Sequence, residues 1–342
     1  MLESRFPTVT VVIVTYNAEN TIEKCLQSVR TQNYPQDKIN IIIVDGSSKD
    51  ATVSIAKKFG VPVTIVPLRL QNAEYNKGVA VRKAKGEFLL MIDHDNILPH
   101  SDWLQKMVQP LLENSSIVAV EPLWYHYDQS FSLLDRYFAL FGIGDPLAYY
   151  LGKSDHLSYL TNTYNLYGKA TDRGMYYEVE FDKDRIPTLG ANGFLIRREI
   201  LVNNARIDED SFFHIDVNVD LIRKGFNTYA FIKDDIIHLT GYKSITGFLY
   251  RRKLYMEQFY IVNKKARRYS IYSPDDKLKL ITFVIYAVTF IKPTFDAMRG
   301  FLKIHDFSWF LHPLLCFSLV IIYGSVIVKN MYKTYVAAIF EK

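Results

Sequence analysis

The chain has 342 residues, of which 49% are hydrophobic and 23% are charged, and its formal net charge is +5. This composition supplies enough apolar side chains for one large folded domain and a further segment, and it excludes a disordered or low-complexity protein. Two cysteines far apart in the sequence, Cys25 and Cys316, predict no disulfide framework and fit a reducing compartment. The opening residues MLESRFPTV contain no apolar signal core, so we expect the segment after them to stay in the cytoplasm.

The first hundred residues alternate short apolar runs with amphipathic segments. Four runs have the length and β-branched content of buried strands, at residues 9–15, 39–44, 61–66 and 88–92. Three segments between them are expected to be helices, from residue 20 to the Tyr34-Pro35 break, over residues 49–59 and over residues 73–85. This alternation predicts an α/β fold with a mostly parallel, doubly wound sheet and right-handed crossovers.

The stretch GEFLLMIDHDN at residues 86–96 ends a predicted strand with two carboxylates one residue apart, Asp93 and Asp95. Ligands of open α/β sheets bind beyond the carboxyl ends of the strands, and alternate residues of an extended chain point to one side. A pair of acids there suits Mg²⁺ or Mn²⁺, which keeps further coordination positions for water and a diphosphate. The same spacing also occurs on solvated turns, so the spacing alone leaves that alternative open.

Polar residues also end the first two predicted strands. Thr15 follows the first and Asp45 the second, so both are expected on the same edge of the sheet as Asp93. We expect a nucleotide there, with Asp45 accepting a hydrogen bond from the base and the Thr15 turn touching the ribose. The sequence has no G-x-G-x-x-G after the first strand and no G-x-x-x-x-G-K-[ST], which argues against a dinucleotide fold and a P-loop.

Three stretches, VTVVIVTYNAENTIEKCLQSV, IIIVDGSSKDAT and NKGVAVRKAKGEFLLMIDHDNIL, resemble the family-2 glycosyltransferases of the GT-A fold, over roughly residues 7–240. The resemblance implies a Rossmann-like domain in which a DxD motif holds the metal on the diphosphate. The metal ligands it implies are Asp93 and Asp95, on either side of His94. The nucleotide-binding residues it implies are Thr15, Tyr16, Asn17, Asp45, Asn76, Gly78 and Asp93. Tyr75 stands where many members carry an arginine.

The resemblance extends to two later stretches. LGANGFLIR at residues 189–197 is similar to a Gly-Ala-rich strand of the family, where small residues let a sugar or acceptor approach the backbone. The acceptor or sugar residues it implies are Gly190, Ala191, Asn192 and Gly193. His238 matches a histidine that members place near the diphosphate or metal and is expected as a third metal ligand, with a structural role as the alternative.

The catalytic base is expected in FFHIDVNVDLIRKG, at residues 212–225. Inverting members carry an acid before a helix at this point. One alignment puts Asn218 at the base position, where an amide cannot take a proton. A shift by two residues gives Asp216, which we prefer. Asp216 could instead cap the following helix, and a polyprenyl phosphate acceptor, already an anion, would need no base.

A basic segment follows the predicted catalytic domain. Between Lys243 and Lys279 there are ten Lys or Arg against three Asp or Glu, so this stretch carries about +7 and the rest of the chain about −2. Nucleic acid would be one partner, but apolar segments follow. Basic residues beside apolar spans are typical of the cytoplasmic membrane face, where headgroups attract each by ~1 kcal/mol. Arg251 and Arg252 could pair with an acceptor phosphate or with headgroups.

Two apolar segments follow the basic one. Residues 307–328 contain no Asp, Glu, Lys or Arg over 22 residues, which is long enough for a helix that crosses a bilayer. Residues 278–291 are almost entirely apolar and are broken by Lys292 and Pro293, so they predict either a kinked span or a re-entrant segment. Earlier in the chain, the aromatic stretch at residues 131–160 could lie on the membrane or pack in a core.

We therefore expect four parts. They are a cytoplasmic GT-A domain over residues 1–242, basic juxtamembrane helices over residues 243–277, a transmembrane hairpin of about two helices over residues 278–330 and a cytoplasmic tail over residues 331–342. This arrangement predicts a multi-pass protein of the cell membrane, with membrane lipids and no nucleic acid among its partners.

The expected activity is inverting, metal-dependent transfer of a sugar from a nucleotide sugar to a lipid-linked acceptor, either polyprenyl phosphate or a lipid-linked saccharide. Two alternatives remain open. One is a non-catalytic, membrane-anchored scaffold that binds a nucleotide sugar. The other is a sugar-phosphate nucleotidyltransferase, which should carry a basic, glycine-rich loop after the first strand, where this chain has TYNAEN.

Overall fold

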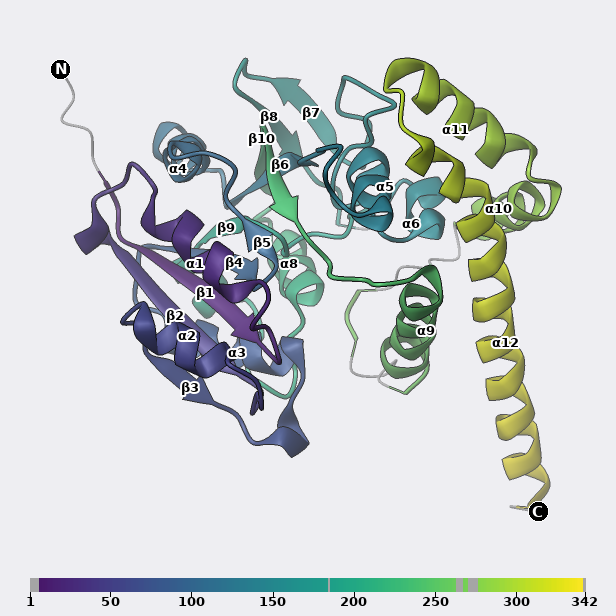
Figure 1. The fold of residues 1–342 in the computed structure, drawn as a ribbon, viewed down its shortest axis with the longest axis horizontal. Helices are drawn as coiled ribbons and strands as arrows, with labels where there is room; N and C mark the ends of the chain where they lie inside the picture. Colours follow the sequence, from purple (N-terminus) through teal and green to yellow (C-terminus); the bar gives the residue numbers. More distant parts are fainter. Residues whose placement is uncertain (1–5, 184, 263–266, 270–275, 341–342) are drawn as a thin grey trace. The chain divides into compact units, whose positions relative to one another are not determined.

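The computed structural model describes residues 6–183, 185–262, 267–269 and 276–340 (Figure 1). The opening MLESR, part of the predicted basic segment and the last two residues of the predicted tail lie outside this range. Chain contacts divide the protein into two compact units. Unit 1 contains the residues up to 127, 155–157 and 163–240, and unit 2 contains residues 128–154, 158–162 and those from 241 onward.

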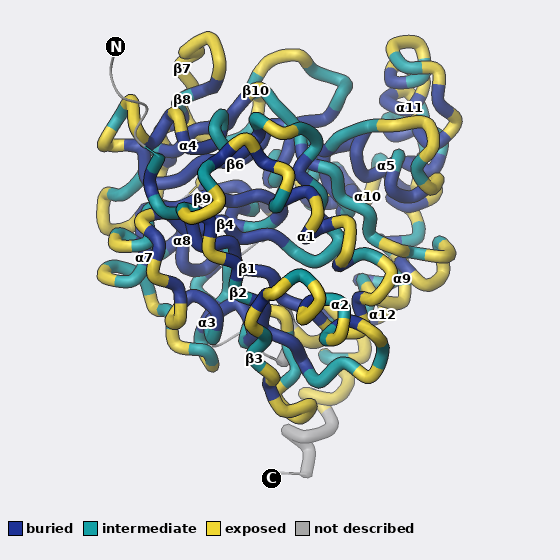
Figure 2. The backbone as a smooth tube through the Cα atoms, turned by 60° about the vertical axis from the view of Figure 1, so that its left-hand side comes forward, coloured by how far each residue is buried: buried dark blue, intermediate teal, exposed yellow. Residues whose placement is uncertain are grey.

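Unit 1 is built on a sheet whose parallel part comes from the first four strands of the chain. These are β1 (Val9–Thr15), β2 (Ile39–Asp45), β3 (Val63–Ile65) and β4 (Phe88–Asp93), in the order β3-β2-β1-β4. The β-branched run of β1 is buried at all seven residues, as the centre of a sheet covered on both faces requires (Figure 2). The helices that connect these strands are α1 (Ile22–Arg30), α2 (Thr52–Lys58) and α3 (Ala73–Lys83).

The second half of the sheet differs from the prediction. It adds β5 (Asn96–Ile97), β6 (Ala119–Tyr125), β7 (Lys169–Asp172), β8 (Tyr176–Glu180), β9 (Phe194–Arg197) and β10 (Thr228–His238). Five of the nine pairings between these ten strands are antiparallel. The sheet is therefore mixed and not mostly parallel. Strand β9 accounts for two of these pairings, because it runs antiparallel between β4 and β6 after a turn with positive φ at Gly190, Asn192 and Gly193. The other three pairings involve β5, β7, β8 and β10.

Three further helices of unit 1 accompany the later strands. Helix α4 (Trp103–Glu113) begins shortly after β5, and Trp103 donates its indole N–H to the carbonyl of Asp235 at 2.7 Å. Helix α7 (Arg198–Asn204) continues directly from β9, and α8 (His214–Arg223) precedes β10. Helix α4 packs against β6 and β10, and α7 packs against β9 and α8.

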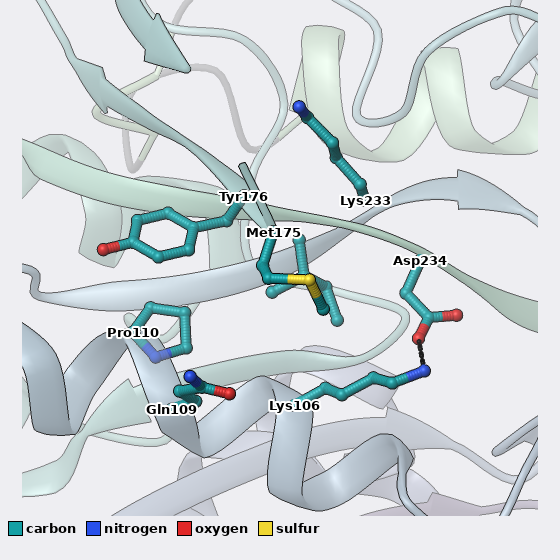
Figure 3. A pocket seen from close by; sticks show the side chains of 8 residues that line it. Lys106, Gln109, Pro110, Met175, Tyr176, Lys233 and Asp234 are labelled. Carbon is teal, nitrogen blue, oxygen red and sulfur yellow. Dashed lines mark hydrogen bonds and ion pairs between the residues drawn. The ribbon is translucent and has the colours of Figure 1, made fainter. Parts of the chain in front are cut away.

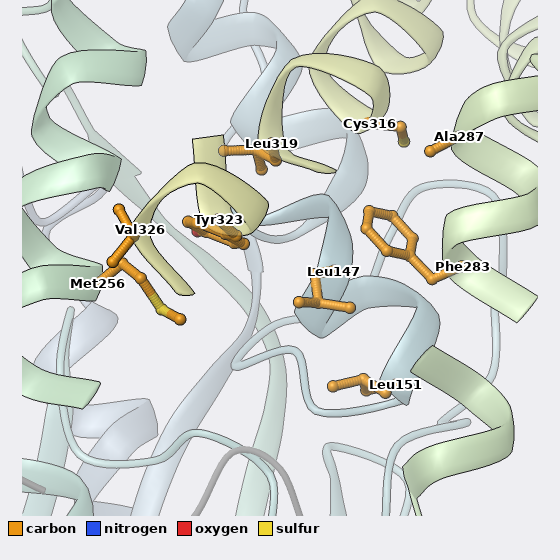
Figure 4. Close-up of a cluster of buried hydrophobic side chains, with 9 residues drawn as sticks. All are labelled: Leu147, Leu151, Met256, Phe283, Ala287, Cys316, Leu319, Tyr323 and Val326. Atoms are coloured by element: carbon orange, nitrogen blue, oxygen red, sulfur yellow. The ribbon is translucent and has the colours of Figure 1, made fainter. Parts of the chain in front are cut away.

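Unit 2 is helical. It consists of α5 (Leu133–Phe141), α6 (Pro146–Leu151), α9 (Ile245–Tyr255), a π-helical turn (Met256–Val262), α10 (Lys277–Thr289), α11 (Ile291–Lys303) and α12 (Leu311–Phe340). Its core joins residues far apart in the sequence (Figure 4), namely Leu147, Leu151, Met256, Phe283, Ala287, Cys316, Leu319, Tyr323 and Val326. The predicted N-terminal domain ran unbroken to residue 242, whereas residues 128–154 and 158–162 group with the C-terminal helices because α5 and α6 pack against them.

One segment of unit 2, Phe307–Tyr335, is long and apolar enough to cross a membrane, with a mean hydropathy of 2.1. The shorter helices α10 and α11 meet at a bend of 77°, at Phe290, which has a φ of 61°. Each has 13 residues, about 20 Å at 1.5 Å per residue, which is less than the ~30 Å of a bilayer core. Helix α12 also continues past residue 330 to Phe340, so the predicted tail is helical in its described part.

The packing of α11 yields a prediction about stability. A side chain on Gly300 would overlap the indole ring of Trp309, which is fully buried, whereas Gly324 on α12 has open space around it. We expect Gly300→Ala to lower the free energy of unfolding by ~1–3 kcal/mol through overpacking. Gly324→Ala should leave it unchanged or raise it by up to ~1 kcal/mol, because alanine favours helix. Thermal melting of the two variants measures the difference, and equal melting temperatures would contradict this packing.

Candidate active site at the carboxyl edge of the sheet

Three turns meet at one edge of unit 1 because their strands are in register. Thr15 pairs with Asp45 at the ends of β1 and β2, and Val14 pairs with Asp93 at the end of β4. This confirms that the polar residues after three separate strands lie along one edge of the sheet, where α/β proteins bind ligands.

Asp45 organises the turn after β2. Its carboxylate is buried and accepts hydrogen bonds from the Thr15 hydroxyl at 2.7 Å, the Ser48 amide at 2.7 Å and the Ser48 hydroxyl at 2.6 Å. Both carboxylate oxygens are thus engaged with the protein. A contact between Asp45 and a nucleotide base stays a prediction, and it would compete with Ser48 for the carboxylate.

The turn after β1 is preformed by Asn17, whose φ is 50°. The Asn17 amide donates to the Ser48 hydroxyl at 2.8 Å, and its side-chain oxygen accepts from the Lys49 amide at 3.0 Å. The neighbouring Tyr16 side chain is 40% exposed. The two turns therefore hold each other, and Tyr16 is the predicted nucleotide-binding residue that they leave open to a ligand.

The DxD turn is fixed from two sides. The His94 ring shares a hydrogen bond of 2.8 Å with the hydroxyl of Thr21, and β10 brings His238 opposite Asn96. As a result His238 Nε2 lies 3.6 Å from Asp95 Oδ2. Burial favours the neutral acid, but the positive field of His238 outweighs it and lowers the pKa of Asp95 to about 2. Asp95 is therefore an anion at neutral pH.

Asp93 has a partner that the sequence did not predict, the buried Lys77 on α3. The ammonium lies 3.1 Å from Asp93 Oδ1 and 3.9 Å from Glu74 Oε1. Glu74 in turn accepts hydrogen bonds from the His214 amide and ring, both at 2.8 Å. Burial raises the pKa of Glu74, but the opposite effect of His214 and Lys77 is larger and brings this pKa down to about 2. A chain of opposite charges thus links α8, α3 and the end of β4.

The atoms at this edge show whether it suits a divalent cation. Within the described part of the chain, no group of three or more His, Cys, Asp or Glu residues is arranged as a metal site. Asp95 and His238 form a pair near Asp93. Asp95 Oδ1 is buried and has no hydrogen bond, and Asp93 Oδ1 faces only the Lys77 ammonium. Carboxylate oxygens are the ligands that a hard cation prefers, so Asp95 Oδ1, which lacks a donor, fits Mg²⁺ or Mn²⁺. Asp93 Oδ1 fits the same cation if the cation takes the place of the Lys77 ammonium.

The two predicted residues of α3 lie in tight surroundings. Asn76 is buried and its side-chain oxygen has no hydrogen-bond partner. A side chain on Gly78 would come within 2.9 Å of the backbone of Glu209 and 3.0 Å of Phe212. The glycine thus allows close packing of α3, and Asn76 presents an unsatisfied acceptor.

The glycines of the loop 190–193 are closely packed against other parts of unit 1. A side chain on Gly190 would come within 2.6 Å of the His214 carbonyl, and one on Gly193 within 2.8 Å of Ile236. Protein atoms therefore occupy the space that we expected a sugar to use at these two glycines. Asn192 is buried, with a φ of 55°, while the neighbouring Ala191 is partly exposed. Access of an acceptor to this loop stays a prediction for these two residues.

Asp216 lies in the first turn of α8 and is 1% exposed. The residue that begins the helix as its N-cap is Phe213, so Asp216 is not the N-cap. Asn218 donates to the His214 carbonyl at 2.9 Å and accepts from the Tyr229 hydroxyl at 2.9 Å. Both ends of its amide have structural partners, and the choice of Asp216 over Asn218 as the base stays a prediction.

The predicted arginines belong to unit 2. Arg252 forms an ion pair with Asp145, and its Nε donates to the Tyr323 hydroxyl at 3.1 Å. Its guanidinium therefore joins α9 to α6 and α12. Arg251 is exposed.

A pocket lies beside α4 and β10 in unit 1 (Figure 3). It is lined in part by Lys106, Met175 and Asp234, and the Lys106 ammonium lies 3.1 Å from Asp234. None of the predicted site residues lines it.

Comparison with known proteins relates the segment that forms this edge to a protein family. Residues 10–173 match the family described as Glycosyl transferase family 2. This segment of the chain is similar to family-2 glycosyltransferases. The match includes Thr15, Asp45, Asp93 and Asp95, so the edge lies within the matched segment.

Two archaeal relatives have related segments. Glycosyltransferase AglE from Haloferax volcanii is 29% identical over 114 residues, which cover 32% of this chain and 37% of that protein. The dolichyl N-acetyl-alpha-D-glucosaminyl phosphate 3-beta-D-2,3-diacetamido-2,3-dideoxy-beta-D-glucuronosyltransferase from Methanococcus voltae is 26% identical over 106 residues, 30% of this chain and 33% of that protein. The chain thus aligns with about a third of the length of these curated relatives.

One solved structure shares the fold. The mannosyltransferase PcManGT from Pyrobaculum calidifontis, in complex with GDP-Man and Mn²⁺, superposes with a TM-score of 0.50 at 17% identity. The alignment covers 96% of this chain and 88% of that chain. The mixed α/β sheet of unit 1 is consistent with the expected GT-A fold.

Several residues in and around the site were not predicted. Glu74 and Lys77 are opposite charges three residues apart inside a predicted helix, a spacing that indicates an ion pair but not its burial. Nothing in the sequence marked His214 as their partner. Tyr125 and Asp155 had no sequence signal, because they come together only in the folded chain, where the Tyr125 hydroxyl donates to Asp155 at 2.7 Å.

The lowered pKa of Glu74 predicts a pH effect. Its ordinary pKa is 4.5 and its folded-state pKa is about 2. The ionised form therefore stabilises the fold above about pH 5, and this contribution disappears as the pH falls toward 2. It corresponds to about 3 kcal/mol at 1.36 kcal/mol per pKa unit. Glu74→Gln should thus be less stable than wild type at pH 7, with the gap closing in acid, measured by denaturant unfolding.

The matched control is Glu23→Gln, which removes an exposed acid from the first turn of α1. Its stability relative to wild type should change little with pH. A constant gap for Glu74→Gln between pH 7 and pH 3 would contradict the ion pair with His214 and Lys77.

Proposed function

We propose that the chain transfers a sugar from a nucleotide sugar to a lipid-linked acceptor, with inversion at the anomeric carbon. The observation that carries the proposal is the placement of Asp93 and Asp95 at the sheet edge, inside the segment that matches the glycosyltransferase family. The preformed turns of Asn17 and Asp45 lie along the same edge and offer a surface for the nucleotide.

The carboxylates of Asp93 and Asp95 would hold Mg²⁺ or Mn²⁺, which supplies positive charge to the leaving diphosphate. The complex of PcManGT with GDP-Man and Mn²⁺ supports a nucleotide sugar and a divalent cation for this fold. The ammonium of Lys77 is a second positive group next to Asp93, on the helix where Tyr75 replaces the arginine that many members carry. Its ammonium can neutralise charge that develops on the leaving group.

The acceptor nucleophile needs either a base or its own negative charge. Asp216 is our sequence candidate for the base, and its burial in the first turn of α8 means that the acceptor must reach the start of that helix. A phosphate acceptor would supply its own charge.

A lipid-linked acceptor is supported by the exposed apolar side chains of unit 2. On α11 they fall on one face, at Ile291, Phe295, Met298 and Leu302, each more than half exposed. The opposite face of α11 is buried. Together with the apolar length of Phe307–Tyr335, this stripe favours attachment to a membrane. The bend between α10 and α11 favours a segment that lies in the interface over a second span.

The remaining parts of the proposal follow the charge of the sequence. The basic segment after residue 242 favours attachment at the cytoplasmic face. Arg251 is exposed, so its guanidinium is accessible to a phosphate or a headgroup. The Methanococcus voltae relative is named for a dolichyl-linked saccharide substrate, which supports a lipid-linked acceptor here as well.

The cation role of Asp95 predicts the effect of one substitution. Asp95→Asn should weaken binding of a nucleotide sugar in the presence of Mn²⁺ and lower nucleotide release by at least ~100-fold, because the leaving diphosphate loses its charge stabilisation. Nucleotide release from a panel of UDP-, GDP- and dTDP-sugars measures it. Asp37→Asn, an exposed acid before β2, should match wild type. Wild-type release by Asp95→Asn would refute the cation role, and no release by wild type with any donor would favour a non-catalytic scaffold.

Membrane attachment predicts a pattern of shielding. Leu302 on α11 is 74% exposed and Leu112 on α4 is 44% exposed, while both native cysteines are buried. In isolated membranes, a membrane-impermeant maleimide should label Leu112→Cys at least ~10-fold faster than Leu302→Cys or Val328→Cys, because lipid covers the latter two. Equal labelling rates at the three positions would mean that the apolar stripe faces water.

A further inference from the structure

Beside the DxD turn, unit 1 contains a second polar cluster that the donor site does not use. Its members are Glu121, Tyr125, Asp155, His156 and Asn192. Residues 155–157 are a short excursion of the chain into unit 1, held on the sheet by the Leu157 amide, which donates to the Leu123 carbonyl at 2.8 Å, and by Asp155. The fold thus brings Asp155 and His156 to the end of β6.

A series of hydrogen bonds connects this cluster to the DxD turn. Asn96 accepts from the Asp93 amide at 2.9 Å and donates to Asn192 at 3.2 Å. Asn192 donates to the Tyr125 hydroxyl at 2.7 Å, and Tyr125 donates to Asp155 Oδ2 at 2.7 Å. The Tyr125 ring also lies 5.2 Å from the His238 ring, which contacts Asp95. The orientation of Asp155 is therefore tied to the residues that hold the donor.

Two carboxylate oxygens of the cluster have no hydrogen-bond partner, Asp155 Oδ1 and Glu121 Oε2. Glu121 is 1% exposed, and its other oxygen accepts from the Gly190 amide at 2.6 Å. Burial, with some repulsion from Asp155, raises the pKa of Glu121 well above its ordinary range, which favours the protonated acid. Buried polar atoms are nearly always paired in folded proteins, so these two oxygens call for a polar partner from outside the chain.

The chemistry of that ligand follows from the charges. In the described part of the chain, neither Glu121 nor Asp155 has a Lys or Arg partner, and the ring of His156 is buried against Tyr125 with its pKa lowered by burial. A phosphate would meet the carboxyl groups of Asp155 and Glu121 without a compensating cation. A sugar hydroxyl can donate to Asp155 and accept from the protonated form of Glu121. The cluster is thus suited to a hydroxyl and not to a phosphate.

We propose that this cluster is the acceptor subsite, that the nucleophile is a sugar hydroxyl of a lipid-linked saccharide, and that its base is Asp155 in place of the sequence candidate Asp216. The inference rests on the proposed function and chooses between its two acceptor classes. The hydroxyl proton passes to Asp155 Oδ1 as the oxygen bonds to the anomeric carbon. The bond from that carbon to the diphosphate breaks, and the leaving diphosphate keeps the electron pair. Tyr125 is a positioning residue, since it holds the other oxygen of Asp155.

The test uses the full chain in detergent with Mn²⁺, radiolabelled nucleotide sugars and a lipid extract of the host membrane as the acceptor. Mild acid cleaves the glycosyl phosphate bond of the labelled lipid. A sugar joined to a hydroxyl is then released as part of an oligosaccharide, which we expect. Release of the label as a monosaccharide would mean a phosphate acceptor. That result would overturn this inference and leave the proposed function intact.

Variants test the role of Asp155. Asp155→Asn should lower kcat for lipid labelling by at least ~100-fold while nucleotide-sugar affinity stays within about twofold of wild type, which also verifies folding. Tyr125→Phe should lower kcat by a smaller factor, and the exposed Asp37→Asn should match wild type. Wild-type kcat in Asp155→Asn would overturn the inference. If wild type itself binds no nucleotide sugar, both the proposed function and this inference are wrong.

Discussion

The arrangement of the site depends on how the chain holds two acids at the end of a buried strand. Asp93 and Asp95 would repel each other and their surroundings if they had no partners in this partly buried place. Lys77 offsets the charge of Asp93, and His238 offsets that of Asp95. Each partner comes from a different element, so the acids are in place only when α3, β4 and β10 have all assembled.

Much of this could be predicted from the sequence. Strands β1, β2 and β4 are continuous apolar runs, and a polar residue ends each of them, so the edge with Thr15, Asp45 and Asp93 followed from pattern alone. The antiparallel β9 could not be predicted, because its direction is set by three residues with positive φ in one loop. The cluster around Asp155 was equally hidden, since residue 155 meets Tyr125 only through the fold.

The helical unit explains why the predicted division of the chain was too simple. Apolar side chains at Leu147 and Leu151 precede the C-terminal helices by more than 100 residues but pack with Cys316, Leu319 and other residues of α12. Their position in the sequence places them in the predicted catalytic domain, whereas their contacts place them with the C-terminal helices. The same packing fixes α12 on one side and leaves its remaining apolar side chains exposed, together with those of α10 and α11.

The proposed reaction requires Asp93 and Asp95 to bind a divalent cation that contacts the diphosphate of the donor. Anomalous scattering from a crystal grown with Mn²⁺ and a nucleoside diphosphate locates that cation. We expect one manganese peak in contact with a carboxylate oxygen of Asp95 and with the diphosphate. A peak elsewhere, for example at His100 and Asp234, which lie 2.9 Å apart, with none at Asp95, would contradict it.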